Sequence, residues 1–405
     1  MVSSKNNRVL IVDALRGFAL FMIVAIHFVE HFHLFSSPEI NFLFTPEQDR
    51  WVRDTVFKLV SGKAYSVFAL LFGLSFFIQM DRKQRKGVDF RGRFFWRLIL
   101  LFVMGVMHSL LYSGDILHVY AVLGILLLLV FKWQFRTLVV LAVLLLLQLP
   151  LLAEFFASFR DSGYNKLTYF SMYWDEANQI RTSGSFWELI QFNVLKGRQM
   201  AWSWSWNNGR LLQLTALFVL GLLLGRIHFF ERLDSYKKRL LPWAGICILL
   251  FGFVMWLRTL VTSGAWNAAQ KEVANVWLQS FSNLAVTGLI VIALAWIYTK
   301  KWLGWWFRQL ACCGRMSLTN YVCQPVVGVL LFYGFGLALH RFIGTSWSLL
   351  IGVVFFAMQV AVSSWWFEKF RYGPLEWLWR ALTFMNFSLP MRKKADLAKR
   401  VPAEG

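Results

Sequence analysis

The chain has 405 residues, of which 58% are hydrophobic and 16% are charged, and its formal net charge is +21. A basic chain can bind nucleic acid, but these lysines and arginines stand in short connectors between apolar runs such as "TLVVLAVLLLLQLPLL", not on one soluble face. The composition therefore excludes a soluble globular domain and a nucleic-acid partner. It predicts an all-α, polytopic integral membrane protein whose partner is the lipid bilayer.

Apolar runs long enough to cross a bilayer as helices, about 20 residues each, recur along the whole chain and predict about ten membrane spans. They cover residues 9–33, 56–80, 94–113, 115–132, 136–156, 211–230, 240–260, 275–298, 316–339 and 346–368. The first span follows Lys5 and Arg8 as the apolar part of a signal peptide would, but no small-residue cleavage site follows it. We expect it to be a retained span.

The spans divide the chain into four predicted parts. These are an N-terminal membrane half (1–156), an aromatic-rich connector (157–209), a C-terminal membrane half (210–385) and a basic tail (386–405). Connectors such as "DRKQRKGVDFRGR" and the tail "MRKKADLAKR" carry many lysines and arginines, whereas the alternate connectors are acidic or nearly neutral. Positively charged connectors remain in the cytoplasm, so we expect both termini to be cytoplasmic.

The long connector is too aromatic for a disordered linker. We expect helices that lie on the outer membrane surface. Its residues Trp202, Trp204 and Trp206 then serve as interfacial anchors, with a substrate-binding role as the alternative.

Polar residues share one face of the first predicted span. On a helix that turns about 100° per residue, Asp13, Arg16 and His27 fall on one stripe. A central Arg or Asp costs about 2.5–3.5 kcal/mol on insertion scales, so this stripe is expected to face the bundle interior or a water-filled cleft. Asp13 and Arg16 stand three residues apart and can form an ion pair.

The residues alone leave two interpretations of this stripe open. In the first, Asp13 and Arg16 form a structural ion pair and His27 is a hydrogen-bonded core residue. In the second, His27 is a general base and Arg16 binds a phosphate or carboxylate. A base and an anion-binding group on one face suit the transfer of an acyl group from a phosphate-bearing carrier.

The segment "RVLIVDALRGFALFMIVAIHF" resembles the opening of the acyltransferase-type-three superfamily and of heparan-glucosaminide N-acetyltransferase-like membrane proteins. These proteins begin with an Arg, then Asp-x-Leu-Arg-Gly, then a His on the same helix. The matching positions are Arg8, Asp13, Leu15, Arg16, Gly17 and His27. The resemblance favours the functional interpretation, in which His27 is catalytic and Asp13 and Arg16 bind substrate.

The whole chain is more closely similar to the bacterial YeiB-like family, the domain of unknown function 418. The similarity is carried by "SGKAYSVFALLFGLSFFIQM" (61–80), "GDILHVYAVLG" (114–124), "GRMSLTNYVCQ" (314–324) and "FRYGPLEWLWRALT" (370–383). This family has no settled activity. The resemblance implies a multi-pass protein of the bacterial inner membrane.

The second of these blocks contains Asp115, and His118 lies three residues further on the same helical face. Asp115 can be the N-cap of the fourth span. The resemblance implies a second role, in which Asp115 is catalytic and faces the outer mouth of a cavity below which His27 sits, with His118 binding substrate.

Further substrate-binding candidates come from the other blocks. Lys63 can extend its amine outwards to the membrane surface or pair with Glu30 or Asp115. Ser317, Asn320 and Gln324 share one face of the ninth span and either form interhelical hydrogen bonds or line a cavity. In the last block, Glu376 and Arg380 are spaced for an ion pair across one helical turn.

We therefore expect a membrane-embedded acyltransferase with acyl-coenzyme A as its donor substrate, no bound cofactor and no metal site. The acceptor would be a hydroxyl or amine of a glycan, a lipid or a small molecule. The alternative is a transporter or proton-coupled permease in which His27 relays protons. A third alternative is a non-catalytic membrane partner protein.

Overall fold

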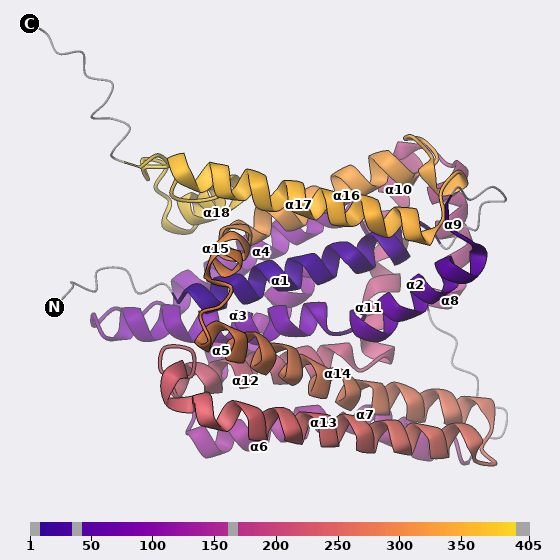
Figure 1. Ribbon diagram of the computed structural model, residues 1–405, viewed down its shortest axis with the longest axis horizontal. Coiled ribbons are helices and arrows are strands. Elements are labelled where there is room, and N and C mark those ends of the chain that lie inside the picture. Colours follow the sequence, from indigo (N-terminus) through magenta and orange to yellow (C-terminus); the bar gives the residue numbers. More distant parts are fainter. Residues whose placement is uncertain (1–8, 35–42, 161–168, 394–405) are drawn as a thin grey trace, which may run out of the picture.

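The computed structural model describes residues 9–34, 43–160 and 169–393. Apart from one β-bridge between Phe370 and Arg392, these residues form helices, turns and loops, as predicted for an all-α chain. The long helices lie side by side along the long axis of the molecule (Figure 1). We call the end at which α1 (Leu10–Ile26) begins the terminal end, and the opposite end, where α4 (Arg91–Ser109) finishes, the distal end.

Helices occur, in chain order, in the N-terminal half, the connector and the C-terminal half into which the sequence was divided. The N-terminal half contains α1, the π-helical turn η1 (His27–Phe32), α2 (Pro46–Leu59), α3 (Ala64–Gln84), α4, α5 (Leu117–Val130), α6 (Phe135–Leu147) and α7 (Leu149–Ala157). The connector contains α8 (Tyr169–Met172), α9 (Trp174–Ser183), α10 (Phe186–Phe192), the π-helical turn η2 (Asn193–Gly197) and α11 (Arg198–Asn207). The C-terminal half contains α12 (Arg210–Arg226), α13 (Leu233–Ser263), α14 (Ala268–Thr299), α15 (Gly304–Arg315), α16 (Ser317–Phe332), the 3-10 turn η3 (Leu339–Arg341), α17 (Thr345–Lys369) and α18 (Pro374–Phe384). Residues 394–405 of the predicted basic tail lie outside the described ranges.

Seven helical segments among the described residues are long and apolar enough to cross a membrane, or eight if Phe186–Asn207 and Arg210–Arg226, which meet at 70°, form one bent span. Two shorter apolar helices, α5 and α16, complete the set. With these two included, the segments correspond in order to the predicted spans. The second segment, Pro46–Gln84, begins earlier than the predicted span and consists of two helices, α2 and α3, with a break at residues 60–63 that the predicted span crosses. Thr45 and Gln48 form the capping box at which α2 begins.

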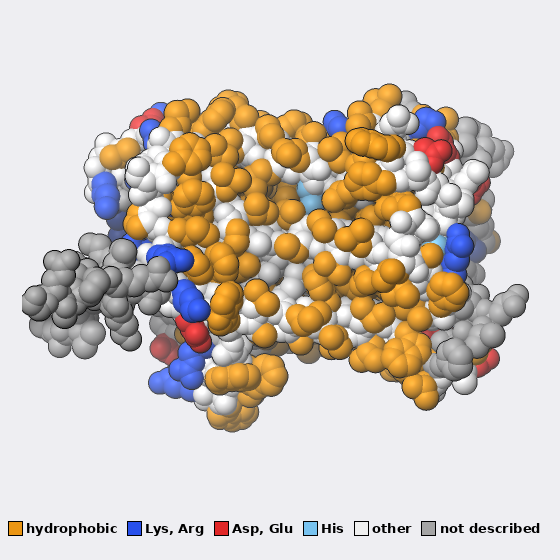
Figure 2. All heavy atoms as spheres, turned by 90° about the horizontal axis from the view of Figure 1, so that it is seen from above, with side chains coloured by type: hydrophobic (Ala, Val, Ile, Leu, Met, Phe, Trp, Pro, Cys, Tyr) orange, Lys and Arg blue, Asp and Glu red, His pale blue; other side chains and the backbone are white. Residues whose placement is uncertain are grey.

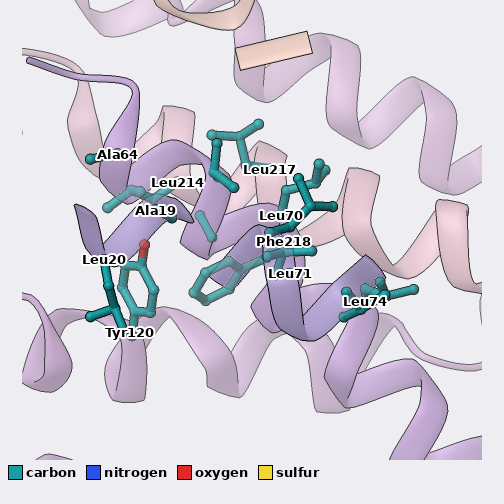
Figure 3. Packing of buried hydrophobic residues seen from close by; sticks show 14 of the residues in the cluster. Ala19, Leu20, Ala64, Leu70, Leu71, Leu74, Tyr120, Leu214, Leu217 and Phe218 are labelled. Carbon is teal, nitrogen blue, oxygen red and sulfur yellow. The ribbon is translucent and has the colours of Figure 1, made fainter. Parts of the chain in front are cut away.

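Helix α1 lies at the centre of the bundle, in contact with α3, α15, α16 and α17 (Figure 1). Of its membrane-spanning window 78% is buried, compared with 11% for α13. Beside it, α3 and α12 form the apolar core in which Leu70 and Leu71 pack near Leu217 and Phe218 (Figure 3). The polar residues of α1 are therefore enclosed by protein, whereas α13 presents most of its surface outwards.

The outer surface of the bundle suits a bilayer. On the face shown in Figure 2, hydrophobic side chains form a band between charged side chains at the two ends. Leu249 of α13 is 74% exposed and Leu129 of α5 is 68% exposed. Apolar surface of this extent is unfavourable in water and favourable in lipid. The chain is a multi-pass membrane protein.

Helix α18 lies against the start of α16 and stabilises it. The carboxylate of Glu376 accepts hydrogen bonds from the backbone N–H groups of Leu318 and Thr319, at 2.7 and 3.1 Å, and from the Thr319 hydroxyl at 2.7 Å. Burial raises the pKa of the Glu376 carboxyl, and these hydrogen bonds oppose the rise in part. The ion pair predicted between Glu376 and Arg380 is wrong, because the carboxylate caps α16 while the Arg380 guanidinium lies over the Tyr372 ring.

Helices α1 and α15 approach each other more closely than any side chain at position 17 would allow. A Cβ atom on Gly17 would lie 2.1 Å from the backbone oxygen of Leu310. Small residues allow such contacts between membrane helices, and dispersion forces then act over many atoms. Gly17 thus fixes α1 against α15.

We expect Gly17→Ala to lower the free energy of unfolding by about 1–3 kcal/mol, because the two helices must separate to admit the methyl group. The control is Gly252→Ala on α13, where a Cβ atom would meet no atom within 4 Å. This substitution should leave stability unchanged or raise it slightly through helix propensity. Thermal unfolding in detergent measures both, and equal melting temperatures for the two variants would contradict the assignment to Gly17.

Candidate active site

Two histidines share one carboxylate where α4 ends and α5 begins. Nδ1 of His108 donates to Oδ1 of Asp115 at 2.7 Å, and Nδ1 of His118 donates to Oδ2 at 2.7 Å. The exposed fractions of His108, Asp115 and His118 are 5%, 2% and 1%. An ionised carboxylate only accepts hydrogen bonds, so it fixes the proton of each ring on Nδ1 and leaves Nε2 as a base. Neither Nε2 atom has a hydrogen-bond partner in the described part of the chain.

The local chain path explains why Asp115 can reach both rings. Its Oδ2 atom also accepts the backbone N–H of His118 at 3.1 Å, so Asp115 caps the start of α5. A Cβ atom at Gly105 would lie 2.9 Å from Oδ2 of Asp115 and 2.4 Å from the backbone nitrogen of His118, so no larger residue fits there. The capping role expected of Asp115 is confirmed, and the same carboxylate also binds two imidazoles; its catalytic role stays a prediction.

His27 lies next to the same group of residues, at the first position of the π-helical turn η1. Its ring centroid is 4.9 Å from that of Tyr112 and 6.1 Å from that of Tyr321. The ring of His108 lies 4.9 Å from Tyr321 and 6.2 Å from Tyr112. Both histidines thus contact the same two tyrosines. We call His27, His108, Asp115 and His118 the histidine site.

The three polar residues predicted on one face of α16 serve different purposes. Asn320 donates to the Cys313 carbonyl at 3.2 Å and to the Ser363 hydroxyl at 3.0 Å, which links α16 to α15 and α17. Gln324 is fully buried, and neither amide atom has a hydrogen-bond partner within the described ranges. Ser317, at the first position of α16, lies about 10 Å of helix rise from Gln324. Asn320 forms interhelical contacts, and the substrate-binding role of Gln324 stays a prediction.

Lys63 takes neither of the two positions considered from the sequence. It is 3% exposed, so its amine does not extend to the surface. Among the described residues it forms no ion pair with Glu30 or Asp115. Its Nζ instead donates to the Lys58 carbonyl at 2.8 Å and so satisfies the end of α2.

Asp13 and Arg16 form the ion pair that their spacing predicts, with 2.5 Å between Nη1 and Oδ1. Nη2 of Arg16 donates to the hydroxyl of Ser75 on α3. The Asp13 side chain is 4% exposed and that of Arg16 is 21% exposed. The charge of the guanidinium is compensated by Asp13, so a structural role for the pair is the simpler explanation.

The connector folds over the distal end and touches the histidine site. Nδ2 of Asn193 donates to the Leu110 carbonyl in the turn between α4 and α5 at 2.9 Å. The Trp202 ring lies 5.6 Å from that of His118, and Trp204 lies 5.2 Å from the guanidinium of Arg210. Trp206 alone of the three is exposed, at 55%. Trp202 and Trp204 are half-buried and contact protein groups, so the role of the three tryptophans as interfacial anchors stays a prediction.

Sequence reasoning missed His108, although it is one of only seven histidines. It lies near the end of a predicted apolar span, seven residues before Asp115, and helical spacing does not connect the two across the intervening turn. Tyr112 and Tyr321 were missed for a similar reason, since aromatic residues are common in any membrane bundle. A survey of every titratable residue within the spans would have selected His108.

Two family models and several bacterial proteins match the sequence of this chain. Residues 8–172 match the family model described as "Heparan-alpha-glucosaminide N-acetyltransferase, catalytic", and residues 224–386 match that described as "Protein of unknown function (DUF418)". The chain is 27% identical over 418 residues to the uncharacterized protein YxaH of Bacillus subtilis (strain 168), with 97% of this chain and 98% of that protein covered. It is 27% identical over 410 residues to the uncharacterized protein YeiB of Escherichia coli (strain K12), with 92% and 95% covered.

These matches confirm the resemblance drawn from the sequence motifs. The part that resembles the N-acetyltransferase model contains His27, His108, Asp115 and His118. The chain is thus similar to a membrane acetyltransferase-like family in its N-terminal half.

The ion pair between Asp13 and Arg16 can be tested by a double-mutant cycle. Asp13→Ala or Arg16→Ala leaves a partly buried charge without its partner, so the double variant should lose less stability than the two single losses summed. We expect a coupling free energy of about 0.5–3 kcal/mol from thermal unfolding in detergent. Strictly additive losses would mean that the two residues do not stabilise each other.

Proposed function

We propose that the chain is a membrane acyltransferase that moves an acyl group from acyl-coenzyme A to a hydroxyl or amine. The observation that supports it best is the geometry at Asp115, where one buried carboxylate orients two imidazoles so that both Nε2 atoms are bases. A carboxylate that fixes a histidine through Nδ1 is the arrangement used in many acyl-transfer sites. The similarity of residues 8–172 to an N-acetyltransferase catalytic model points to the same chemistry.

In the proposed reaction, the acceptor O–H or N–H donates a hydrogen bond to Nε2 of His108 or His118. As the acceptor attacks the thioester carbonyl, its proton passes to Nε2, and the imidazolium that forms is stabilised by Asp115. Collapse of the tetrahedral intermediate breaks the C–S bond. The imidazolium then returns its proton to the departing coenzyme A thiolate, which restores the neutral ring.

His27 is placed to act on the donor side of this reaction. It lies on the chain that continues α1 from the terminal end, and the rings of Tyr112 and Tyr321 lie close to both His27 and His108. Direct attack by the acceptor and an acyl group carried on His27 are two routes through the same residues. Because Asp13 compensates Arg16, we assign the donor phosphates to the basic connectors at the terminal end.

This scheme requires the terminal end to face the cytoplasm, where acyl-coenzyme A is found, and so implies an inner-membrane protein with the histidine site towards the outer side. Fusions to alkaline phosphatase, which is active only outside the cytoplasm, test the orientation. A fusion after residue 185 should be active and one after residue 393 inactive, because lysines and arginines gather at the terminal end. The reverse pattern would refute the orientation.

We expect His108→Gln to lower turnover by about 10²- to 10⁴-fold while leaving the melting temperature nearly unchanged. Asp115→Asn should lower turnover as much and also lower the melting temperature, because an amide nitrogen cannot accept the hydrogen bonds that the buried carboxylate accepts. Gln retains a hydrogen-bonding group but no base, and Asn removes the charge that stabilises the imidazolium. His27→Gln should abolish turnover if the acyl group passes through His27. The measurement is transfer of a labelled acetyl group from acetyl-coenzyme A to a membrane extract by the reconstituted protein.

The matched control is His228→Gln. His228 forms a hydrogen bond with Glu231 in a loop at the terminal end, whereas the histidine site lies at the distal end. It should retain full activity. Full transfer by well-folded His108→Gln and His27→Gln proteins would remove both histidines from the mechanism. Vectorial flux of an intact solute without any new covalent product would instead identify a transporter.

A further inference from the structure

A second polar region lies between α12, α13 and α14, apart from the histidine site. It is a cavity of about 240 Å³, which we call the distal cavity. Its lining consists of Asn208, Arg210, Arg258, Glu272, Asn275, Val276, Gln279, Ser280 and Asn283. A cavity of this polarity between membrane-spanning helices is a candidate binding site, because polar groups there are unfavourable unless they bind something.

Arg210 is a buried cation that forms no ion pair among the described residues, although the carboxylate of Glu30 is near enough for its charge to act on the guanidinium. It is 9% exposed, and its guanidinium lies 4.9 Å from the Tyr65 ring and 5.2 Å from the Trp204 ring. Its Nε and Nη1 atoms have no hydrogen-bond partner anywhere in the described chain. Aromatic faces hold a guanidinium in place but leave its N–H groups available. Two donors of Arg210 are therefore oriented and unused.

Arg258 brings a second guanidinium to the distal cavity, and neutral groups hold it. Its Nε donates to Oδ1 of Asn275 at 3.2 Å, and its Nη1 donates to Oε1 of Gln279 at 2.6 Å. Gln279 in turn donates to Oδ1 of Asn283 at 2.9 Å. These amides stand four residues apart on one face of α14. They fix the arginine without cancelling its charge.

The charge balance around the distal cavity is positive. The charges of Arg210 and Arg258 also act on the buried amine of Lys63, which adds a third cation nearby. The acid in the lining is Glu272, which is exposed and forms no ion pair among the described residues, and outside the lining the charge of Glu30 acts on Arg210. Three cations against two carboxylates leave an excess of positive charge. Such an excess is costly in a medium of low dielectric constant, and a bound anion lowers that cost.

We propose that the distal cavity binds the phosphate group of an organic phosphate ester. Guanidinium groups match phosphate oxygens with paired N–H donors, and both a doubly charged phosphate monoester and a singly charged lipid phosphodiester offer such oxygens. The volume admits a phosphate with a small ester group such as glycerol. The phosphate can belong to a soluble ester or to the headgroup of a lipid, which would enter beside the lipid-facing helix α13. The proposal does not depend on acyl transfer.

The test is equilibrium binding to the reconstituted full chain, with wild type compared to Arg210→Gln and Arg258→Gln. Glycerol 3-phosphate probes the soluble source, and nanodiscs of phosphatidylcholine with or without phosphatidylglycerol probe the lipid source. Bound phosphatidylglycerol is counted by native mass spectrometry. Each substitution removes charge-assisted hydrogen bonds, so affinity for the phosphate should fall at least tenfold. The matched control is Arg239→Gln, an exposed arginine near the other end of α13, which should bind within twofold of wild type.

If wild type binds glycerol 3-phosphate saturably and both cavity variants lose this binding, the ligand is a soluble ester. If the variants instead lose only the bound phosphatidylglycerol that wild type retains, the ligand is a lipid headgroup. Either result supports the proposal. If neither probe binds saturably, or if the Arg258→Gln protein binds as well as wild type, the proposal is wrong. Arg258→Gln carries the test alone if Arg210→Gln fails to fold, because its partners are uncharged amides.

Discussion

The shared carboxylate of Asp115 is the interaction on which the rest of the distal end depends. A buried carboxylate in a membrane bundle is stable only when its oxygens are fully used, and here two imidazole N–H groups and one backbone N–H supply the donors. That requirement explains the absence of a side chain at Gly105 and the sharp turn between α4 and α5. The connector lies over this turn, where Asn193 donates to the Leu110 carbonyl.

Helix α1 carries polar residues near both of its ends. The ion pair of Asp13 and Arg16 lies near its start, and His27 lies in the π-helical turn that follows it. These polar residues must be enclosed by protein, and the enclosure comes from close contact with α15 at Gly17 and from packing on α3, α16 and α17. A π-helical turn at the position of His27 is consistent with a site, because such turns are frequent where a helix is adapted to function.

Helix α11 connects the histidine site with the distal cavity. Trp202 faces His118 and Trp204 faces Arg210, two residues apart and on opposite sides of one helix. The two regions differ in charge. The histidine site is organised around one anion, whereas the distal cavity is organised around arginines held by aromatic rings and neutral amides. The base proposed for the histidine site and the anion-binding arginines proposed for the distal cavity would stand on separate elements, since these arginines lie on α12 and α13 and not on α1.

The sequence by itself determined the membrane class, the order of the spans and the pairing of Asp13 with Arg16, because apolar run length and helical spacing are local properties. It also selected His27, Asp115 and Gln324 as buried polar residues. Only the tertiary structure decided which groups meet. His108 forms a hydrogen bond with Asp115 across a turn, and the Lys63 amine donates to a backbone carbonyl. Glu376 caps α16 instead of pairing with Arg380, and the Trp202 ring contacts that of His118. Each of these contacts joins separate elements or crosses a turn, and the periodicity of a single helix carries no information about the position of its neighbours.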